Sequence, residues 1–165
     1  MRPFKRARKL FSLHRMSSLL STRRRRGIRI VFTNGVFDVL HAGHVRYLTA
    51  ARRLGDLLVI GLNTDSSVRR IKGPRRPLVR QSDRAELLSA LDCVDYIVLF
   101  SDPTPYRLIK ALGPDILVKG ADWAEKDIVG ADIMKATGGT VKRIRLAQGK
   151  STSGLVDLIL RRYSK

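Results

Sequence analysis

From residue 28 onward, short apolar runs alternate with amphipathic segments of helical length. The apolar runs are rich in Val, Ile and Leu, and they are short enough for strands that are buried on both faces of a sheet. We therefore predict five strands, at Ile28–Thr33, Asp56–Leu62, Tyr96–Phe100, Asp115–Lys119 and Thr140–Ile144.

The segments between these runs have helical spacing. In Gly43–Leu54, the side chains of Val45, Leu48 and Ala51 fall on one face, and Gly55 follows as a stop signal. Four further helices are predicted at Ser82–Leu91, Pro105–Leu112, Ile128–Thr137 and Ser151–Arg161.

This alternation predicts an α/β fold, a Rossmann-like doubly wound parallel sheet in a single domain with helices on both faces. We expect the last helix to turn Leu155, Leu158 and Ile159 toward the core. In such sheets, ligands bind beyond the carboxyl ends of the strands, near the point where the strand order reverses. Four loops satisfy that rule, at residues 34–43, 63–81, 120–127 and 146–152.

The charge is uneven along the chain. The sequence has 33 Lys and Arg residues against 14 Asp and Glu, a net charge of +19, and residues 1–27 contain no acidic residue. We predict a basic, disordered N-terminal extension at residues 1–27 and a folded domain at residues 28–165. Two other interpretations of the extension are an organellar targeting peptide and a misassigned start, with Met16 as the true first residue.

Composition excludes several classes of protein. No apolar run is long enough to span a bilayer. The single cysteine, Cys93, excludes an internal disulfide framework and a cysteine-rich metal site, and we expect a cytoplasmic location. The positive charge raises a nucleic-acid-binding module as a rival hypothesis, but aromatic-rich RNA-binding signatures and a recognition helix are missing, which argues against nucleic acid as a partner.

Residues 32–44 read FTNGVFDVLHAGH. His41 precedes the predicted helix and His44 lies in its first turn, so both imidazoles can face one object at the helix N-terminus. That terminus is a ready anion site, and Gly43 allows close approach of the backbone. Zinc would need a third ligand that no nearby residue supplies. P-loop and dinucleotide-binding patterns are also absent, so we interpret the pair as a phosphate clamp and expect Asp38 to orient the turn.

Five segments carry a family resemblance. They are TNGVFDVLHAGHVRYL, GLNTDSSVRRIKGPRRPL, DRAELLSALDCVDYIVLF, DILVKGADW and KSTSGLVDLIL, and together they cover nearly all of residues 28–160. They resemble the HxGH nucleotidyltransferase superfamily, in particular its cytidylyltransferase-like branch and the D-glycero-β-D-manno-heptose 1-phosphate adenylyltransferases within it. The chain departs from that group at KGADW, where KGGDY is usual and glycerol-3-phosphate cytidylyltransferases have tryptophan, and at Ser153, where the group has a second threonine.

The resemblance implies that a heptose 1-phosphate attacks the α-phosphorus of ATP and that pyrophosphate leaves without a covalent enzyme intermediate. Mg²⁺ would accompany ATP, and the product would be ADP-heptose, a precursor of lipopolysaccharide. It also implies a homodimer, and a separate sugar kinase that makes the substrate. Two related reactions remain alternatives: CTP with glycerol 3-phosphate, and ATP with FMN.

The resemblance also assigns roles to residues. His41 and His44 would bind the triphosphate and stabilise charge in the transition state, and Lys72 would reach a phosphate. Asp122 would accept hydrogen bonds from ribose or act through Mg²⁺, and no direct protein ligands to a metal are expected. The nucleotide-binding candidates are Thr33, Asn34, Gly35, Val36, Phe37, Gly43, Lys119, Gly120, Asp122, Trp123, Ser151, Thr152 and Ser153. The candidates for the substrate phosphate are Arg75, Arg76 and Arg84.

Overall fold

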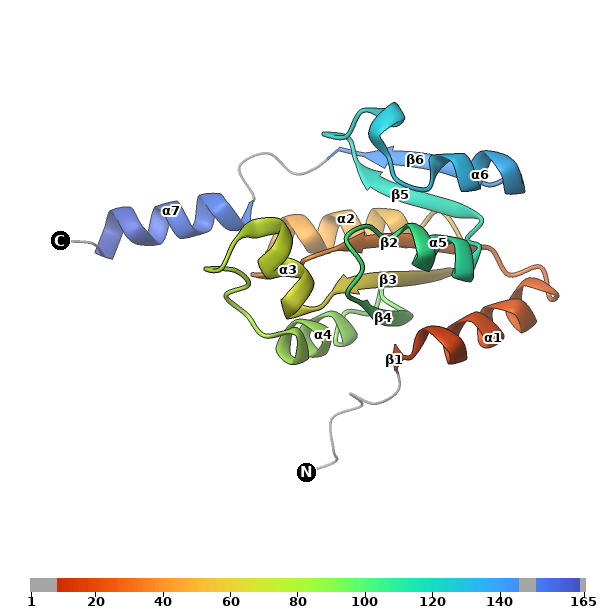
Figure 1. The fold of residues 1–165 in the computed structure, drawn as a ribbon, viewed down its shortest axis with the longest axis horizontal. Coiled ribbons are helices and arrows are strands. Elements are labelled where there is room, and N and C mark those ends of the chain that lie inside the picture. Colours follow the sequence, from red (N-terminus) through yellow and green to blue (C-terminus); the bar gives the residue numbers. More distant parts are fainter. Residues whose placement is uncertain (1–8, 146–150, 164–165) are drawn as a thin grey trace, which may run out of the picture.

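One parallel sheet organises the molecule. The computed structural model describes residues 9–145 and 151–163 (Figure 1). Six strands lie in the order β1-β4-β3-β2-β5-β6, and every neighbouring pair is parallel. The strands are β1 (Leu10–Phe11), β2 (Ile30–Gly35), β3 (Leu57–Asn63), β4 (Tyr96–Phe100), β5 (Ile116–Gly120) and β6 (Thr140–Ile144).

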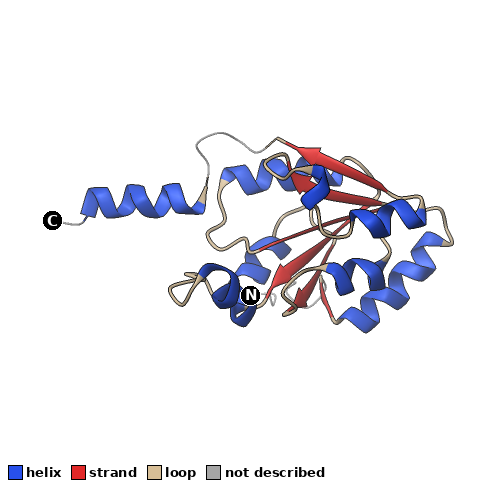
Figure 2. Cartoon of the chain, turned by 45° about the horizontal axis from the view of Figure 1, so that its top comes forward, coloured by secondary structure: helices blue, strands red, loops and turns tan. Residues whose placement is uncertain are grey.

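Helices cover both faces of the sheet (Figure 2). They are α1 (Leu13–Arg24), α2 (Ala42–Arg52), α3 (Asp65–Lys72), α4 (Gln81–Ser89), α5 (Tyr106–Leu112), α6 (Ala131–Thr137) and α7 (Thr152–Tyr163), with a short 3₁₀ turn at Glu125–Asp127. Buried side chains of α2 and α4 pack with one face of the sheet, and those of α1, α5 and α6 pack with the other. The predicted α/β, doubly wound fold is confirmed.

The strand order also locates the binding crevice. The chain runs from β2 outward through β3 to β4, and then crosses back to place β5 on the other side of β2. The connections therefore diverge between β2 and β5, which is where open α/β sheets bind their ligands. The carboxyl ends of these two strands are Asn34–Gly35 and Lys119–Gly120.

The expectation of disorder in the N-terminal extension is wrong for residues 9–27, while residues 1–8 lie outside the described residues. β1 pairs with β4, and the side chains of Met16 and Leu20 are completely buried against the sheet and α5. Arg24 donates to the carbonyl oxygens of Leu112 and Gly113, at 2.8 and 2.7 Å, and so caps α5. A few apolar side chains at the correct helical spacing were enough to fold a strongly basic segment.

This packing makes α1 part of the stability of the domain. Leu20→Ala is expected to lower the free energy of unfolding by about 2–5 kcal/mol, because it leaves a cavity in the core. Ser21→Ala, at an exposed position of the same helix, should change it by less than about 0.5 kcal/mol. Urea titrations of the two variants check this, and equal effects would mean that α1 does not pack as described.

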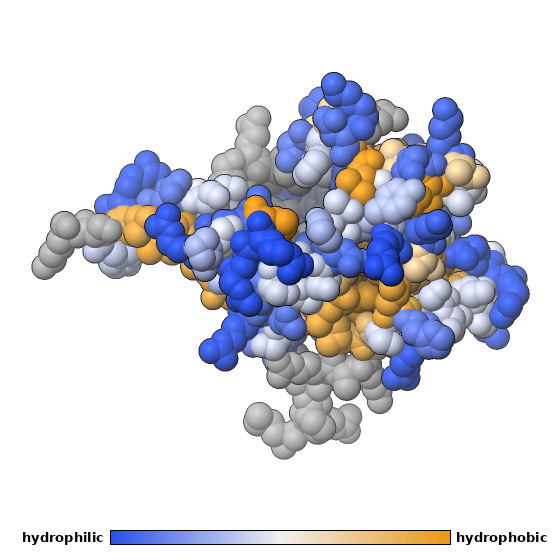
Figure 3. All heavy atoms as spheres, viewed as in Figure 1, coloured by the Kyte–Doolittle hydropathy of each residue, from blue (hydrophilic) through white to orange (hydrophobic). Residues whose placement is uncertain are grey.

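Two further expectations are corrected by the structure. The 63–81 segment contains helix α3, which begins after Thr64, whose hydroxyl oxygen accepts from the amide of Ser67. Helix α7 forms, but it extends away from the body and carries hydrophobic atoms on its surface (Figures 1 and 3). Leu158 and Ile159 are 39% and 56% exposed. Its amphipathic pattern predicted a face suited to burial, but such a pattern does not specify which element covers it.

Candidate functional site

A cavity of about 800 Å³ lies at the carboxyl ends of β2 and β5. Its walls come from the segments after β2, β3 and β5 and from the start of α7, and also from residues 100–105 after β4, a loop that the sequence did not select. Of the predicted loop at 146–152, residues 146–150 lie outside the described residues. The predicted site residues that line it are Asn34, Gly35, Val36, Phe37, His41, Gly43, His44, Lys72, Arg76, Lys119, Gly120, Asp122, Trp123, Ser151, Thr152 and Ser153. Residues that are distant in sequence therefore share one cavity.

His41 and His44 form a stacked pair at the entrance to α2. Their ring centroids lie 3.8 Å apart with an interplanar angle of 20°. Phe37 packs edge-on against His44 at 5.1 Å, and its φ of 48° is unusual for a residue that is not glycine. Such backbone strain costs about 1–3 kcal/mol and is typical of functional sites. The structure thus holds the two imidazoles together on the cavity wall, as the spacing predicted.

The charge state of His44 follows from this packing. Burial, and secondly repulsion from His41, lower the pKa of His44 from 6.5 to about 4. Its Nδ1 atom is buried and makes no hydrogen bond within the described part of the chain. His44 is therefore neutral in the free protein at neutral pH, and an anion bound beside it would favour its protonated form.

This shift predicts how stability depends on pH. Because the folded-state pKa of His44 lies below its unfolded value, its contribution to stability is present above pH 6.5 and is lost as the pH falls toward 4. Thermal unfolding of the wild type and of His44→Asn should therefore diverge in this window, with the wild type losing more stability. Parallel curves would contradict the assigned environment of His44.

Lys119 and Asn34 join the two sides of the crevice. The ammonium group of Lys119, on β5, donates to the side-chain oxygen of Asn34, on β2. Burial lowers the pKa of Lys119 from 10.5 to about 8. The indole ring of Trp123 lies 5.9 Å from the Lys119 Nζ atom and is half exposed to the cavity. A partly buried cation thus lies at the switch point of the sheet.

Thr33 is placed differently from the prediction. It is completely buried and does not line the cavity, because its hydroxyl group is paired with that of Tyr47 at 2.8 Å. Burial raises the pKa of Tyr47 to about 12, so its phenol keeps its proton. Thr33 therefore contacts the cavity residue Tyr47 and does not itself line the cavity.

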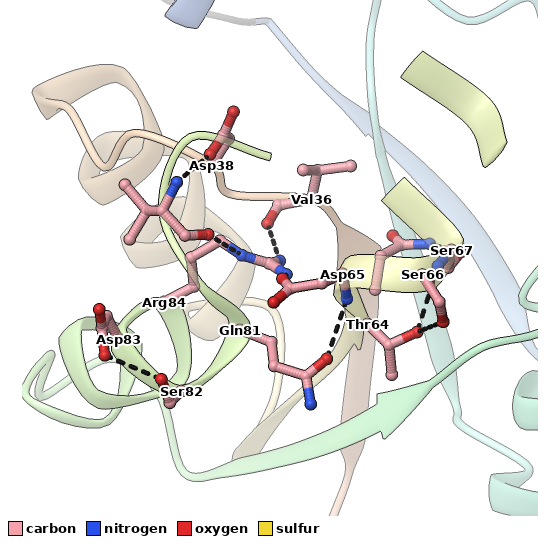
Figure 4. Close-up of polar contacts among 12 residues, drawn as sticks. Val36, Asp38, Thr64, Asp65, Ser66, Ser67, Gln81, Ser82, Asp83 and Arg84 are labelled. Carbon is pink, nitrogen blue, oxygen red and sulfur yellow. Dashed lines mark hydrogen bonds and ion pairs between the residues drawn. The ribbon is translucent and has the colours of Figure 1, made fainter. Parts of the chain in front are cut away.

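Arg84 is also placed differently, since it is buried and engaged within the protein (Figure 4). Its guanidinium pairs with Asp65 at 2.7 Å and donates to the carbonyl oxygens of Val36 and Val79, at 2.6 and 2.9 Å. These partners engage the guanidinium within the protein, and Arg84 does not line the cavity, so the geometry gives no support to the expected contact with a substrate phosphate. Arg75 is exposed and does not line the cavity.

Asp38 holds the basic loop against the site, as expected for a residue that orients the turn. Its carboxylate accepts from the amides of Leu78 and Val79, at 2.7 and 2.9 Å, and pairs with Arg76 at 2.8 Å. Arg76 lines the cavity but is already paired with this carboxylate. Lys72, in contrast, is exposed at the cavity rim.

Some lining residues escaped the sequence analysis. Asn63 ends β3, and the rule of carboxyl ends could have identified it. Val68 and Ile71 belong to α3, a helix that the sequence analysis did not predict. Residues not predicted for the cavity are Asp38, Tyr47, Asn63, Val68, Ile71, Phe100, Pro103, Thr104, Pro105 and Val129.

Clusters of metal ligands and membrane-spanning helices are both absent from the described residues. No group of three or more His, Cys, Asp or Glu side chains within residues 9–145 and 151–163 could hold a metal ion. None of the helices in these ranges combines the length and apolar character needed to cross a membrane.

Comparison with known proteins decides the family. The cytidylyltransferase-like family model matches residues 32–150, a range that includes both histidines, Lys72 and the KGADW segment. The chain belongs to the cytidylyltransferase-like family. The predicted resemblance is thereby confirmed.

Similar proteins support the assignment. The chain is 52% identical to the bifunctional protein HldE of Trichlorobacter lovleyi over 90% of its length, and 47% identical to that of Geobacter metallireducens over 95%. The second match extends well into residues 1–27, consistent with the folded α1. The chain spans about a third of these relatives, 30% and 32% of their lengths.

A solved structure shares the fold. The lipopolysaccharide core biosynthesis protein of Thermoplasma volcanium is 31% identical and aligns with a TM-score of 0.59, covering 73% of this chain and 98% of that one.

Proposed function

We propose that this domain transfers the adenylyl group of ATP to heptose 1-phosphate and releases pyrophosphate. The observation that carries the proposal is the stacked His41–His44 pair at the N-terminus of α2, inside a cavity at the switch point of the sheet. The identity of about one half to the HldE proteins supports the adenylyl and heptose specificity. The name of the Thermoplasma protein is consistent with a role of the product in lipopolysaccharide synthesis.

The cavity suits a nucleotide that spans its length. The nucleoside would lie toward Gly120–Trp123, and the triphosphate would cross the N-terminus of α2 toward Ser151–Ser153. Helix N-termini offer free N–H groups and a partial positive charge to such phosphates. In α7, the hydroxyl oxygen of Ser151 accepts from the amide of Gly154 at 3.0 Å, which fixes that N-terminus beside the cavity.

The reaction needs positioning and charge stabilisation more than a protein nucleophile. An oxygen of the sugar phosphate forms a bond to the α-phosphorus while the bond from that phosphorus to the bridging oxygen breaks, and pyrophosphate leaves with the electron pair. The attacking phosphate is already ionised, so no general base is required. His41 and His44 would stabilise the charge on the reacting phosphoryl group, and Lys72 would hold the acceptor phosphate.

Mg²⁺ is part of the proposal. The described residues hold no cluster of metal ligands, so they fit an ion that enters on the triphosphate oxygens and not one held by the protein alone. When bound, the ion would neutralise phosphate charge, while the histidines and helix N-termini orient the triphosphate.

A nucleotide and acceptor panel tests the proposal. The protein is incubated with ATP or CTP and with heptose 1-phosphate, glycerol 3-phosphate or FMN, and pyrophosphate release is measured. Turnover is expected only with ATP and heptose 1-phosphate. The best-supported alternative is CTP with glycerol 3-phosphate, because Trp123 stands where that group also has tryptophan, and turnover of that pair would replace the proposal.

The cellular setting follows from the proposed reaction. A sugar kinase would supply heptose 1-phosphate, since the acceptor must arrive already phosphorylated. A homodimer and a cytoplasmic location remain predictions, which sedimentation analysis and cell fractionation would check.

A further inference from the structure

The ammonium group of Lys119 has no ion-pair partner among the side chains that the structure describes. Its side chain lies at the carboxyl end of β5 and lines the cavity, and its hydrogen-bond acceptor, Asn34, is neutral. The ion pairs in the described part of the chain involve other residues, so none of them neutralises Lys119. Of the carboxylates lining the cavity, Asp38 is committed to Arg76 and Asp122 is exposed.

Such an arrangement is costly without a ligand. A buried charge is stable when a partner of opposite sign neutralises it, and an amide oxygen does so only in part. A bound anion would supply the missing charge at this partly buried position. The shift in the pKa of Lys119 to about 8 is the expected sign of this unpaired burial.

The position of Lys119 indicates which anion it would meet. On one side lie Gly120 and Trp123, where the proposed function places the nucleoside, and on the other side, across Asn34, begins the segment that carries His41 and His44. In a nucleoside triphosphate, the α-phosphate is the group between the nucleoside and the leaving pyrophosphate. The geometry therefore aligns Lys119 with the α-phosphate and the histidines with the phosphates beyond it.

We infer that Lys119 is a catalytic residue whose ammonium group binds the non-bridging oxygens of the α-phosphate of ATP. This inference rests on the proposed function. As the acceptor oxygen bonds to the α-phosphorus and the pyrophosphate oxygen leaves, negative charge on the equatorial oxygens is held by a fixed cation that the free protein leaves unneutralised. The lysine keeps its proton throughout, so no proton is transferred.

Other charged or titratable groups face the same space, and the test must separate them from Lys119. They are His41 just before α2, His44 and Tyr47 from α2, Lys72 from α3, Arg76 and Asp38 from the neighbouring loops, and Asp122 after β5. Arg143 pairs in register with Lys119 on β6 but does not line the cavity. Replacing Lys119 alone assigns any titration to it, because these groups remain in the variant.

The single tryptophan of the chain provides a direct readout. Trp123 lies 5.9 Å from the Lys119 Nζ atom, so its fluorescence is expected to titrate with the lysine. In the free protein we expect an inflection near pH 8, absent in Lys119→Met. Saturating ATP should move the inflection upward by at least about one pH unit, a tenfold coupling, whereas adenosine, which lacks phosphate, should not. An inflection that ATP leaves in place, or that persists in Lys119→Met, would overturn the inference.

Kinetics give an independent test. Lys119→Met should lower kcat/KM by about 100-fold with the fold intact. Lys119→Arg should retain activity within about tenfold and lose the decline of the wild-type rate at alkaline pH, since arginine keeps its charge. Lys135→Met, at an exposed position of α6, is the matched control and should leave the rate unchanged. Full activity of Lys119→Met would refute the role.

Failure of the inference about Lys119 and failure of the proposed function give different experimental results. The fluorescence experiment uses only ATP and adenosine, so it needs neither an acceptor nor turnover. If ATP shifts the inflection and no acceptor is adenylylated, the contact between Lys119 and the α-phosphate is supported and the proposed function is contradicted. If ADP-heptose forms and ATP does not shift the inflection, the proposed function is supported and the role of Lys119 is contradicted.

Discussion

Replacing His44 by alanine is expected to lower kcat by about 100-fold or more, while ATP still binds and the domain remains folded. Removing one preorganised group that stabilises transition-state charge typically costs this much. The fold should remain intact because the Nδ1 atom of His44 makes no hydrogen bond within the described residues. Removing this atom therefore leaves no described donor or acceptor without its partner. Steady-state kinetics, circular dichroism and ATP titration check the three parts.

The third histidine of the chain is the natural control. His14 lies on the exposed side of α1, outside the cavity lining, so His14→Ala should leave kcat unchanged. A decrease of less than about tenfold in His44→Ala, equivalent to about 1.4 kcal/mol, would contradict a transition-state role for the stacked pair.

Replacing Arg84 by methionine is expected to destabilise the domain by about 3–5 kcal/mol, because it leaves the Asp65 carboxylate without its buried partner. The carbonyl oxygens of Val36 and Val79 lose their donors in the same step. For a domain of this size, the change corresponds to a decrease in Tm of about 6–20 °C. Thermal and urea unfolding measure it directly.

The exposed Arg80 provides a control that distinguishes the loss of a positive charge from the loss of buried contacts. Arg80→Met removes the same charge at an exposed position just before α4, so stability should change by less than about 0.5 kcal/mol. If Arg84→Met were as stable as the control but had a raised KM for the acceptor, Arg84 would contact the substrate and not the site loops.

Periodicity was sufficient to predict five of the six strands of the sheet, all but β1. Buried strands such as β3 and β5 are short runs of Val, Ile and Leu, and hydrophobic burial on both faces leaves them little alternative. The His41–His44 spacing likewise fixed the shared wall of the cavity, because it depends on local helix geometry. These features are local or nearly local, and a single sequence contains them.

Features set by tertiary partners were not predictable. Arg84 is a basic residue near a basic loop, and only the fold reveals that Asp65 and two carbonyl groups surround it. The segment around Met16 is dominated by charge, and its few apolar residues gain meaning only once β4 and α5 are in place. Helix α7 shows the opposite outcome. Its amphipathic pattern suits burial, but no element of the described chain covers its apolar face.

The most direct measurement is to identify the product. The protein is incubated with ATP and heptose 1-phosphate, and in parallel with CTP and glycerol 3-phosphate, and the products are analysed by mass spectrometry. We predict ADP-heptose and pyrophosphate in equal amounts from the first mixture, no product from the second, and loss of the first product in His44→Ala. CDP-glycerol from the second mixture, or unchanged ADP-heptose formation by His44→Ala, would contradict adenylyl transfer to a sugar phosphate at the histidine pair.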